Sequence, residues 1–472
     1  MMAVLTWLSL LAALYIVLFM FKSYFPNKAE HLYQTVGLDI GLFQVKFTCS
    51  AKGRWITSIP TTRKCKVFYK YGMFFTCLLI IPALLFLLVN LLKVSTLIYT
   101  ALMGTAKHNV PLNTEELVFQ PVIPGVTFPM SEVGFYAISL LLSTIYHEFG
   151  HALAADCLDV KLLGYGVLVI FLIPAAYVDL STAELSSLAP NDQLKVYTGG
   201  VWHNVMLSSI AYVLIISYPY LLAPIYLQNE GLFVTNLKNS SVTGPSGLEI
   251  GDLLISVNGC PVRSVQDFHF CLQNYAQTGY CFNGQDLEKL ACTQCCEEKN
   301  SSYLNFQNNH DTSQYCLHVR TAVNTSATFC QSHCDDSSQK CLVPQLTFPH
   351  ESLFHIKRKN QRDFLFIGYS SDLLTGITSM TDFVPKYAFM PITLPIVLEK
   401  LLYYTCSFSL ALGLINIVPC LMLDGQFVAK TLLRLFVQNE STMDCISKYL
   451  IWTGTSLLMA NIILTFFAMK FM

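Results

Sequence analysis

Two histidines and a glutamate lie inside an apolar stretch that is long enough to cross a lipid bilayer. The stretch reads VGFYAISLLLSTIYHEFGHALAAD and carries His147, Glu148 and His151 in the pattern H-E-x-x-H. In a helix, residues i and i+4 project from one face, so the two histidines can grip one metal ion. Ionisable side chains within a membrane segment are costly and mark functional sites. The pattern predicts a zinc site, with Glu148 as general base for the water that the metal activates. The competing interpretation is two hydrogen-bonded histidines in a helix bundle.

A catalytic zinc site needs a third protein ligand, which must come from elsewhere in the chain. Asp424 is the best candidate, because its surroundings are apolar and Pro419 upstream can end a helix and turn the side chain inward. The competing role for Asp424 is that of a turn residue at a helix end. Asp179 is a rival ligand that we expect to cap or orient instead. His203 is expected to be a core or interfacial histidine.

The composition is that of a polytopic membrane protein. Of 472 residues, 53% are hydrophobic and only 12% are charged, with a mean hydropathy of +0.48. Soluble domains contain about 25% charged residues, which excludes an ordinary soluble enzyme. The net charge of −1 gives no reason to expect a nucleic-acid partner.

One polar region carries the signs of an oxidising compartment. Ten of the seventeen cysteines fall between residues 260 and 341, a density typical of a disulfide framework whose pairing the sequence does not reveal. N-glycosylation sequons occur in or beside the region at Asn239, Asn300 and Asn324. The two signals agree, so residues 229–385 are predicted to be lumenal.

The remaining apolar segments define the order of the membrane crossings. We expect an uncleaved anchor helix at 3–21, a basic segment at 22–71 of undecided side, and one long span or a re-entrant hairpin at 72–103. Further spans are expected at 196–227, 387–418 and 446–470. Residues 163–180, rich in glycine and β-branched residues, favour strands that do not cross the membrane. The predicted regions are an N-terminal anchor and basic loop (1–103), the first half of a catalytic core (104–228), the lumenal domain (229–385) and the second half of the core (386–472).

Counting crossings from the lumenal region gives the orientation of the two motifs. The span at 196–227 enters the lumen and the span at 387–418 leaves it, which places Asp424 toward the cytosol. For the H-E-x-x-H motif to reach the same depth, its helix must also run from lumen to cytosol.

The combination of motifs resembles the site-2 protease family of intramembrane zinc metalloproteases. The resemblance rests on HEFGH, on N-x-x-P-x-x-x-x-D-G from Asn416 to Gly425, and on Gly200-x-x-x-Asn204 between them. A PDZ-like segment reads GLEIGDLLISVNGCPV, and the cysteine-rich insertion is similar to that of animal members that release membrane-bound transcription factors. The resemblance implies one Zn²⁺ on His147, His151 and Asp424, with Glu148 activating water.

The same resemblance implies roles for the residues around the metal. Asn416 and Asn204 would hold the substrate or the developing oxyanion, with Pro419 and Gly425 as structural support. The fold class expected is a polytopic α-helical membrane protein with a re-entrant β-like segment and a lumenal PDZ-like, cysteine-rich domain.

The function expected is cleavage within the transmembrane segment of single-pass substrates that have first been cut on the lumenal side. Family members imply sterol-regulatory or stress-response factors as substrates, in the Golgi or endoplasmic reticulum, with links to cholesterol metabolism and the unfolded protein response. The partners would be these substrates and the lipid bilayer. The alternative is a catalytically silent scaffold that binds clients through the PDZ-like domain. A metal transporter would need polar residues distributed along several spans, whereas here they are concentrated at two sites. A prenyl-protein type of H-E-x-x-H protease would use a glutamate as third ligand and would not need the lumenal cysteine-rich insert.

Overall fold

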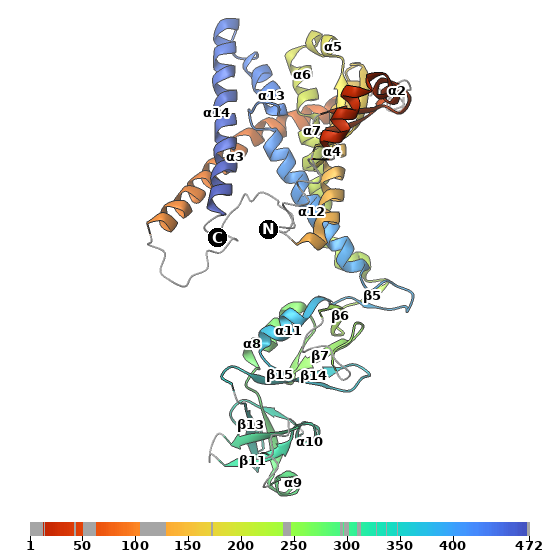
Figure 1. Ribbon diagram of the computed structural model, residues 1–472. Helices are drawn as coiled ribbons and strands as arrows, with labels where there is room; N and C mark the ends of the chain where they lie inside the picture. The colour runs from red at the N-terminus through yellow and green to blue at the C-terminus, as the bar shows by residue number, and fades with distance from the viewer. Residues whose placement is uncertain are drawn as a thin grey trace. The chain divides into compact units, whose positions relative to one another are not determined.

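The computed structural model divides into two compact units. The first comprises Met1–Ile216 and Lys400–Met472, and the second Ser217–Glu399. Figure 1 shows the chain as a ribbon. The structure describes residues 13, 15–41, 44–50, 63–103, 129–170, 173–238, 247–292, 296, 302–308, 313–326, 328–336, 338–346 and 348–469. Residues 104–128, the sequons Asn239 and Asn300 and most of the segment 3–21 lie outside these residues. A short apolar helix is described at Tyr15–Tyr24, overlapping the end of the helix expected at 3–21.

The first unit, which we call the membrane unit, is built from long helices. Four helices of the described chain are long and apolar enough to cross a bilayer, and they are α3, α7, α12 and α14. The helices of this unit are α2 (Pro26–Val36), α3 (Arg63–Leu102), η2 (Met130–Glu132), α4 (Val133–Asp156), α5 (Thr182–Ser187), α6 (Pro190–Tyr197), α7 (Gly199–Leu222), α12 (Leu394–Asn416), α13 (Asp424–Leu433) and α14 (Glu440–Ala468). Residues 72–102 therefore belong to one continuous helix, α3, and the alternative of a re-entrant hairpin at 72–103 is wrong.

Buried polar side chains join the membrane helices in pairs. In α3, the Asn90 amide donates to Asn461 of α14 at 2.9 Å, and Asn461 donates in turn to the carbonyl of Leu87 at 3.0 Å. These bonds explain how an asparagine is accommodated within the apolar run at 72–103, since a buried amide without partners would be costly. The hydroxyl of Thr405 in α12 donates to Ser139 of α4, so these two helices also touch.

A four-stranded antiparallel sheet accompanies the helices of the membrane unit. Its strand order is β1 (Leu38–Gly41), β2 (Gln44–Ser50), β3 (Leu162–Ile170) and β4 (Ile173–Leu180). The strands expected at 163–180 are present as β3 and β4. The hairpin of β1 and β2 was not expected from the sequence, although residues 44–50 alternate apolar and polar side chains as a half-buried strand does. Strand β4 is an edge of this sheet and packs against α4.

The second unit contains two larger antiparallel sheets, each with its own hydrophobic core. The six-stranded sheet takes β6 (Leu232–Leu237), β7 (Leu253–Val257), β8 (Cys260–Pro261), β14 (Ser352–Arg358), β15 (Phe364–Gly368) and β16 (Ile377–Thr381), with α8 (Val265–Asn274) and α11 (Ser370–Gly376). The segment between α8 and β14 forms the five-stranded sheet: β9 (Gly279–Asn283), β10 (Tyr303–Asn308), β11 (Gln314–His318), β12 (Phe329–Cys330) and β13 (Gln339–Gln345), with α9 (Gly284–Leu290) and α10 (Val319–Thr325). A short pair joins β5 (Tyr226–Leu227) to β17 (Val384–Pro385).

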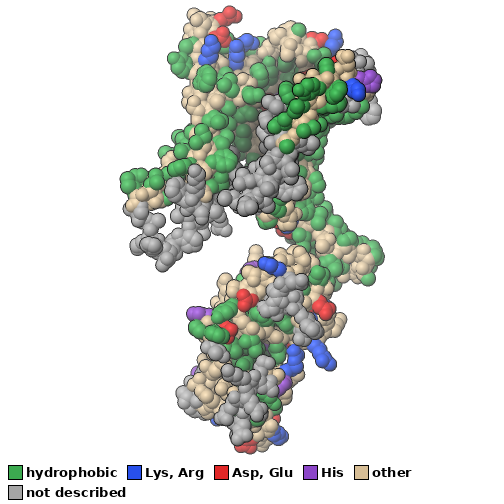
Figure 2. Space-filling model, in the orientation of Figure 1, with side chains coloured by type: hydrophobic (Ala, Val, Ile, Leu, Met, Phe, Trp, Pro, Cys, Tyr) green, Lys and Arg blue, Asp and Glu red, His purple; other side chains and the backbone are tan. Residues whose placement is uncertain are grey.

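Disulfides reinforce this second unit, as the cysteine density predicted. Four bonds join cysteines within its described residues: Cys260–Cys271, Cys281–Cys334, Cys296–Cys316 and Cys330–Cys341. The membrane unit has a bond between Cys65 and Cys157. The surfaces differ as well: apolar side chains cover much of the visible face of the membrane helices, and lysine and arginine gather at the end where α13 lies and α14 begins (Figure 2).

Candidate metal centre

Three side chains from two helices converge in the membrane unit. The Asp424 Oδ2 atom lies 2.9 Å from His147 Nε2 and 3.2 Å from His151 Nε2, and the two Nε2 atoms are 3.2 Å apart. Zinc–nitrogen bonds of about 2.0–2.1 Å in a tetrahedral site place neighbouring ligand atoms about 3.3 Å apart. The spacing of these three atoms therefore fits one zinc ion with a fourth position left for another ligand.

The helix geometry explains why the two histidines share a face. Ser139, Ser143, His147, Gly150 and Ala154 are all buried and follow one another at intervals of three or four residues along α4. This face turns toward the other helices, and Glu148 is displaced from it by one position. The remaining metal ligand comes from the first turn of α13, after a loop that follows α12.

The loop between α12 and α13 brings Asp424 to the histidines. Helix α12 ends at Asn416, three residues before Pro419, as expected for a proline that cannot continue a helix. Gly425 is needed because a Cβ there would lie 2.1 Å from the carbonyl oxygen of Val418. The Asn416 amide nitrogen lies 3.4 Å from His147 Nε2, on the side of the ring that faces the other ligands.

Gly200 allows the backbone of α7 to approach the histidine ligands closely, a role that the Gly200-x-x-x-Asn204 motif did not reveal. A Cβ at this position would lie 2.4 Å from His151 Nε2 and 2.6 Å from His147 Nε2. The backbone of α7 thus covers the ligand atoms directly, and no larger residue fits without displacing them. A second close approach occurs where a Cβ on Gly150 would lie 2.4 Å from the carbonyl oxygen of Gly199.

Each histidine has a partner for the ring nitrogen that faces away from the ligand cluster. His151 Nδ1 lies 2.8 Å from the carbonyl oxygen of Val196, to which it donates its proton, leaving Nε2 free to bind a cation. His147 Nδ1 lies 3.0 Å from the side-chain amide of Asn204. Such outer partners fix the tautomer and the ring orientation of metal-binding histidines. Sequence reasoning missed Val196, since a backbone carbonyl leaves no signature in residue type.

Glu148 lies between the histidines and the edge of the small sheet. Its carboxylate lies near the backbone of Val178 in β4, which packs against α4, and it interacts electrostatically with His147, His151 and Asp424. The candidate base is therefore adjacent both to the metal ligands and to an edge strand.

Two residues considered as ligands lie elsewhere. Asp179 is exposed on β4, paired in register with Gly164, and is not part of the ligand cluster. His203 is buried with its Nε2 3.0 Å from the hydroxyl of Tyr69, whose ring stacks on the imidazole. The expectation of a core histidine at this position is confirmed.

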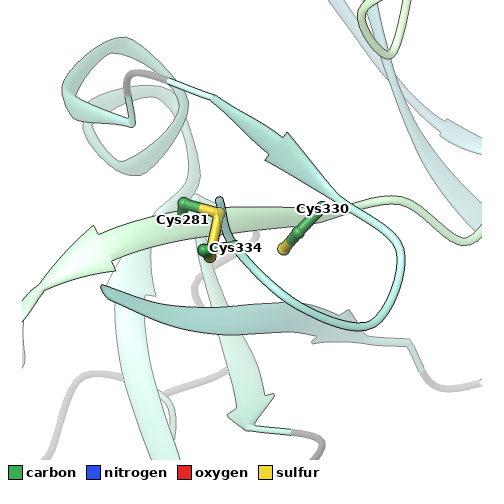
Figure 3. A group of neighbouring side chains, drawn as sticks. All are labelled: Cys281, Cys330 and Cys334. Atoms are coloured by element: carbon green, nitrogen blue, oxygen red, sulfur yellow. A yellow bond between two sulfur atoms is a disulfide. The ribbon is translucent and has the colours of Figure 1, made fainter. Parts of the chain in front are cut away.

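One other group of potential ligands occurs in the described chain, and its chemistry is different. Cys281, Cys330 and Cys334 lie close together in the five-stranded sheet (Figure 3). Cys281 and Cys334 are bonded to each other and Cys330 is bonded to Cys341, so their sulfur atoms are oxidised and do not act as thiolate ligands. Among the described residues, the group of His147, His151 and Asp424 is thus the better candidate for a metal centre.

Comparison with known proteins points to the same region. The chain matches peptidase family M50 over residues 135–460, a range that begins in α4 and ends in α14. It is also similar to a membrane-bound transcription factor site-2 protease homolog from Arabidopsis thaliana, with 27% identity over 146 residues. That stretch covers 31% of this chain and 28% of the relative, so the chain matches less than a third of that protein's length. The extent of the family match shows that this chain belongs to peptidase family M50, the membrane metalloproteases that include the site-2 proteases.

Proposed function

We propose that this protein is an intramembrane zinc endopeptidase that hydrolyses a peptide bond within the transmembrane segment of single-pass substrates. The observation that carries the proposal is the cluster of His147, His151 and Asp424, whose ligand atoms all lie within 4.8 Å of one another. The cluster lies beside Glu148, in a unit whose long helices are apolar. Membership of family M50 supports a protease.

The chain's own residues supply most of the mechanism. Zinc bound to the three ligands would act as a Lewis acid and favour ionisation of water. Glu148 would accept the proton of the attacking water on its carboxylate and deliver it to the departing amide nitrogen. General acid–base catalysis of this kind contributes about 10²–10⁴-fold. The Asn416 amide, which lies on the ligand side of His147, would donate to the oxyanion as the carbonyl carbon becomes tetrahedral.

The edge strand next to the base suggests how a helical substrate is presented. An intact transmembrane helix hides its peptide bonds, so the scissile segment must unwind before hydrolysis. An extended segment can add to the free edge of a sheet through main-chain hydrogen bonds. Strand β4 has such an edge in the described sheet and its Val178 contacts Glu148. A substrate strand laid along β4 would pass the catalytic groups.

The helix directions favour an active site near the cytosolic end of the membrane unit. Ser139, early in α4, contacts Thr405 in the middle of α12, and His147, farther along α4, contacts Asn416 at the end of α12, so these two helices run in parallel. If residues 229–385 are lumenal, both run from lumen to cytosol. Because α3 is a single helix, residues 22–62 would then be cytosolic, in agreement with their basic character.

The second unit would act before cleavage. Its six-stranded sheet contains the segment that resembles a PDZ domain, and a lumenal module here would inspect or exclude the ectodomain of a substrate. Substrates would therefore need a first lumenal cut. We extend to this chain the activity that the name of the Arabidopsis relative describes, with membrane-bound transcription factors as the substrate class and the Golgi or endoplasmic reticulum as the location.

The proposal is tested by substitution of the base. Glu148→Gln is expected to reduce cleavage of a membrane substrate by about 10²–10⁴-fold, the contribution of a general base. The variant should retain zinc, because the three ligands are unchanged. Asp424→Asn removes a carboxylate ligand and should weaken both zinc binding and cleavage. Purified protein that cleaves equally well with Glu148→Gln would refute the mechanism and favour the catalytically silent scaffold.

A further inference from the structure

We infer that Ser409 of α12 is a positioning residue for the zinc ligand His147, acting through the side chain of Asn204. Asn204 itself then holds the metal ligand and not the substrate. The inference rests on the proposed zinc site and concerns which groups orient it. All three residues are buried, with exposed fractions of 0% for Ser409 and Asn204 and 4% for His147.

The location of Asn204 argues against contact with a substrate. Its amide lies against Nδ1 of His147, the ring nitrogen opposite the one that faces Asp424 and His151. The helices are in close contact here, since a Cβ on Gly413 of α12 would lie 3.4 Å from the Cβ of Asn204. An oxyanion formed at the metal would be on the other side of the imidazole ring. The side chain of Asn204 is therefore placed to orient His147.

The protons of His147 and Asn204 constrain how they meet. In the structure, Nδ2 of Asn204 lies 3.0 Å from Nδ1 of His147, which suits a ring protonated on Nε2. A neutral histidine that binds a cation through Nε2 must carry its proton on Nδ1. Two donors would then face each other. The amide must turn over, so that its oxygen accepts the Nδ1 proton; this rotation exchanges two atoms of similar size and needs no additional space.

Ser409 selects the orientation of the amide that zinc binding requires. Its hydroxyl oxygen lies 3.0 Å from the backbone carbonyl oxygen of Asn204 and 3.3 Å from Oδ1 of the Asn204 amide, the position that the NH₂ group takes once the amide has turned over. A hydroxyl has one proton to donate and lone pairs that accept. If it donates to the backbone carbonyl, its lone pairs face the amide and favour the NH₂ group there. The amide oxygen is then directed at His147, and every proton in the network lies between a donor and an acceptor.

A chain of three residues thus links helix α12 to a ligand on α4 through α7. His151 reaches the same result more directly, because its Nδ1 donates to a carbonyl oxygen that can only accept. His147 depends on an amide with both a donor and an acceptor end. For this reason its tautomer needs a further group to choose between the two ends, and Ser409 is that group.

The experiment measures zinc affinity of the purified full-length protein in detergent, by competition with a chromogenic chelator. Ser409→Ala is expected to lower the affinity by about tenfold or more, as loss of an outer partner of a metal ligand does. The matched control is Ser208→Ala, which removes another buried hydroxyl between α7 and α12. This hydroxyl donates to the carbonyl of Cys406 at 3.0 Å and makes no hydrogen bond to His147 or Asn204. The control should bind zinc as the unaltered protein does.

Repeating the Ser409→Ala substitution in an Asn204→Asp protein separates two possible causes of lost zinc affinity: a misoriented amide and altered helix packing. Asn204→Asp presents two oxygens, so either orientation accepts the proton of His147 and no selection is needed. Ser409→Ala should then change zinc affinity by less than about twofold in the Asn204→Asp protein, against the tenfold loss beside Asn204. An equal loss in both backgrounds, or no greater loss than in Ser208→Ala, would overturn the inference.

If the alanine variant does not fold, Ser409→Thr and Ser409→Val test the same inference, because threonine and valine have the same shape and differ in the hydroxyl group. Threonine keeps the hydroxyl and should keep the affinity, whereas valine has the same shape and should lose it; equal affinities would count against Ser409. Failure of the unaltered protein to bind zinc would instead refute the proposed function, so the two failures are distinguishable.

Discussion

The membrane unit and the second unit keep their shape by different means. In the membrane unit, the metal ligands are held by helices that approach closely at glycine and by hydrogen bonds among buried polar side chains. The second unit has two separate hydrophobic cores in sheets of modest size, and four disulfides join its described residues. Small cores bury too little apolar surface to be very stable alone, and covalent links compensate.

The difference indicates which kind of change each unit tolerates. A close helix approach leaves no space for an added methyl group, while the loss of a disulfide leaves helix packing unaltered. The site should therefore be sensitive to small increases in side-chain volume, and the second unit to reduction. The contrast would be wrong if added volume at the site had little effect on zinc binding, or if loss of a disulfide had little effect on the stability of the second unit.

The largest effect is expected from Gly200→Ala. The added methyl carbon would lie 2.4 Å from His151 Nε2 and 2.6 Å from His147 Nε2, so at least one ligand must move. We expect zinc affinity to fall by at least about 100-fold, the upper end of what disturbed outer partners cause, and cleavage to fall to background. Metal analysis of the purified protein measures the first effect.

The matched control for this change is Gly134→Ala in α4, where an added Cβ would have no neighbour within 4 Å. It should bind zinc and cleave substrate normally. A Gly200→Ala protein with full zinc content would mean that α7 does not cover the ligands as closely as the structure indicates.

A smaller effect, confined to the second unit, is expected from removing the Cys281–Cys334 disulfide. The bond closes a loop with a sequence separation of 53 residues, which corresponds to about 4 kcal/mol of stability in the chain-entropy estimate. The double variant Cys281→Ala, Cys334→Ala should become cleavable by protease at a lower urea concentration. Its zinc content should stay unchanged.

The comparable substitution in the membrane unit is Cys65→Ala with Cys157→Ala. These residues lie at the start of α3 and just after α4, on the predicted cytosolic side, where thiols are kept reduced. We expect a smaller loss of stability than in the second unit, measured by the same proteolysis. The contrast between the units would fail if the protein without the Cys281–Cys334 disulfide lost its zinc while α3 and α14 stayed folded. That result would show that the stability of the second unit affects the metal site.

The sequence revealed much of the fold where periodicity and residue type are decisive. The spans, the strands at 163–180 and the disulfide-rich region followed from hydropathy, glycine and β-branched content, and cysteine density. The strands at 38–50 were missed because a basic segment between two apolar runs was interpreted as a loop. Their partner, β3, lies more than a hundred residues away, and no local signal identifies so distant a pairing.

The candidate site was predictable to the extent that its chemistry depends on side-chain type. Two histidines at helical spacing and a carboxylate followed by glycine indicated His147, His151 and Asp424, and the structure brings their ligand atoms together. The steric role of Gly200 and the hydrogen bond from Ser409 to Asn204 depend on the distance between helices. Such distances are set by tertiary packing and leave no signature in the sequence. The place of Asn204 beside the substrate, which the resemblance implied, stays a prediction that the Ser409 and Asn204 variants address.

The smallest effects on stability are expected from substitutions at the glycosylation sequons, which test on which side of the membrane each unit lies. Asn324 is exposed in α10 of the second unit, so its sequon is accessible to glycosylation if this unit is lumenal. Asn324→Gln should then remove one glycan. The variant should migrate faster than the unaltered protein before glycosidase treatment and equally fast after it, with zinc content unchanged.

The sequon at Asn439 provides the opposite case, because the crossing count puts it in the cytosol. Its side chain also accepts hydrogen bonds from the backbone N–H groups of Ser441 and Thr442 at the start of α14. Asn439→Ala should cost about 1 kcal/mol through loss of this helix cap and leave electrophoretic mobility unchanged. A glycan on Asn439 would reverse the predicted orientation of α12 and α14, and with it the placement of the metal centre toward the cytosol.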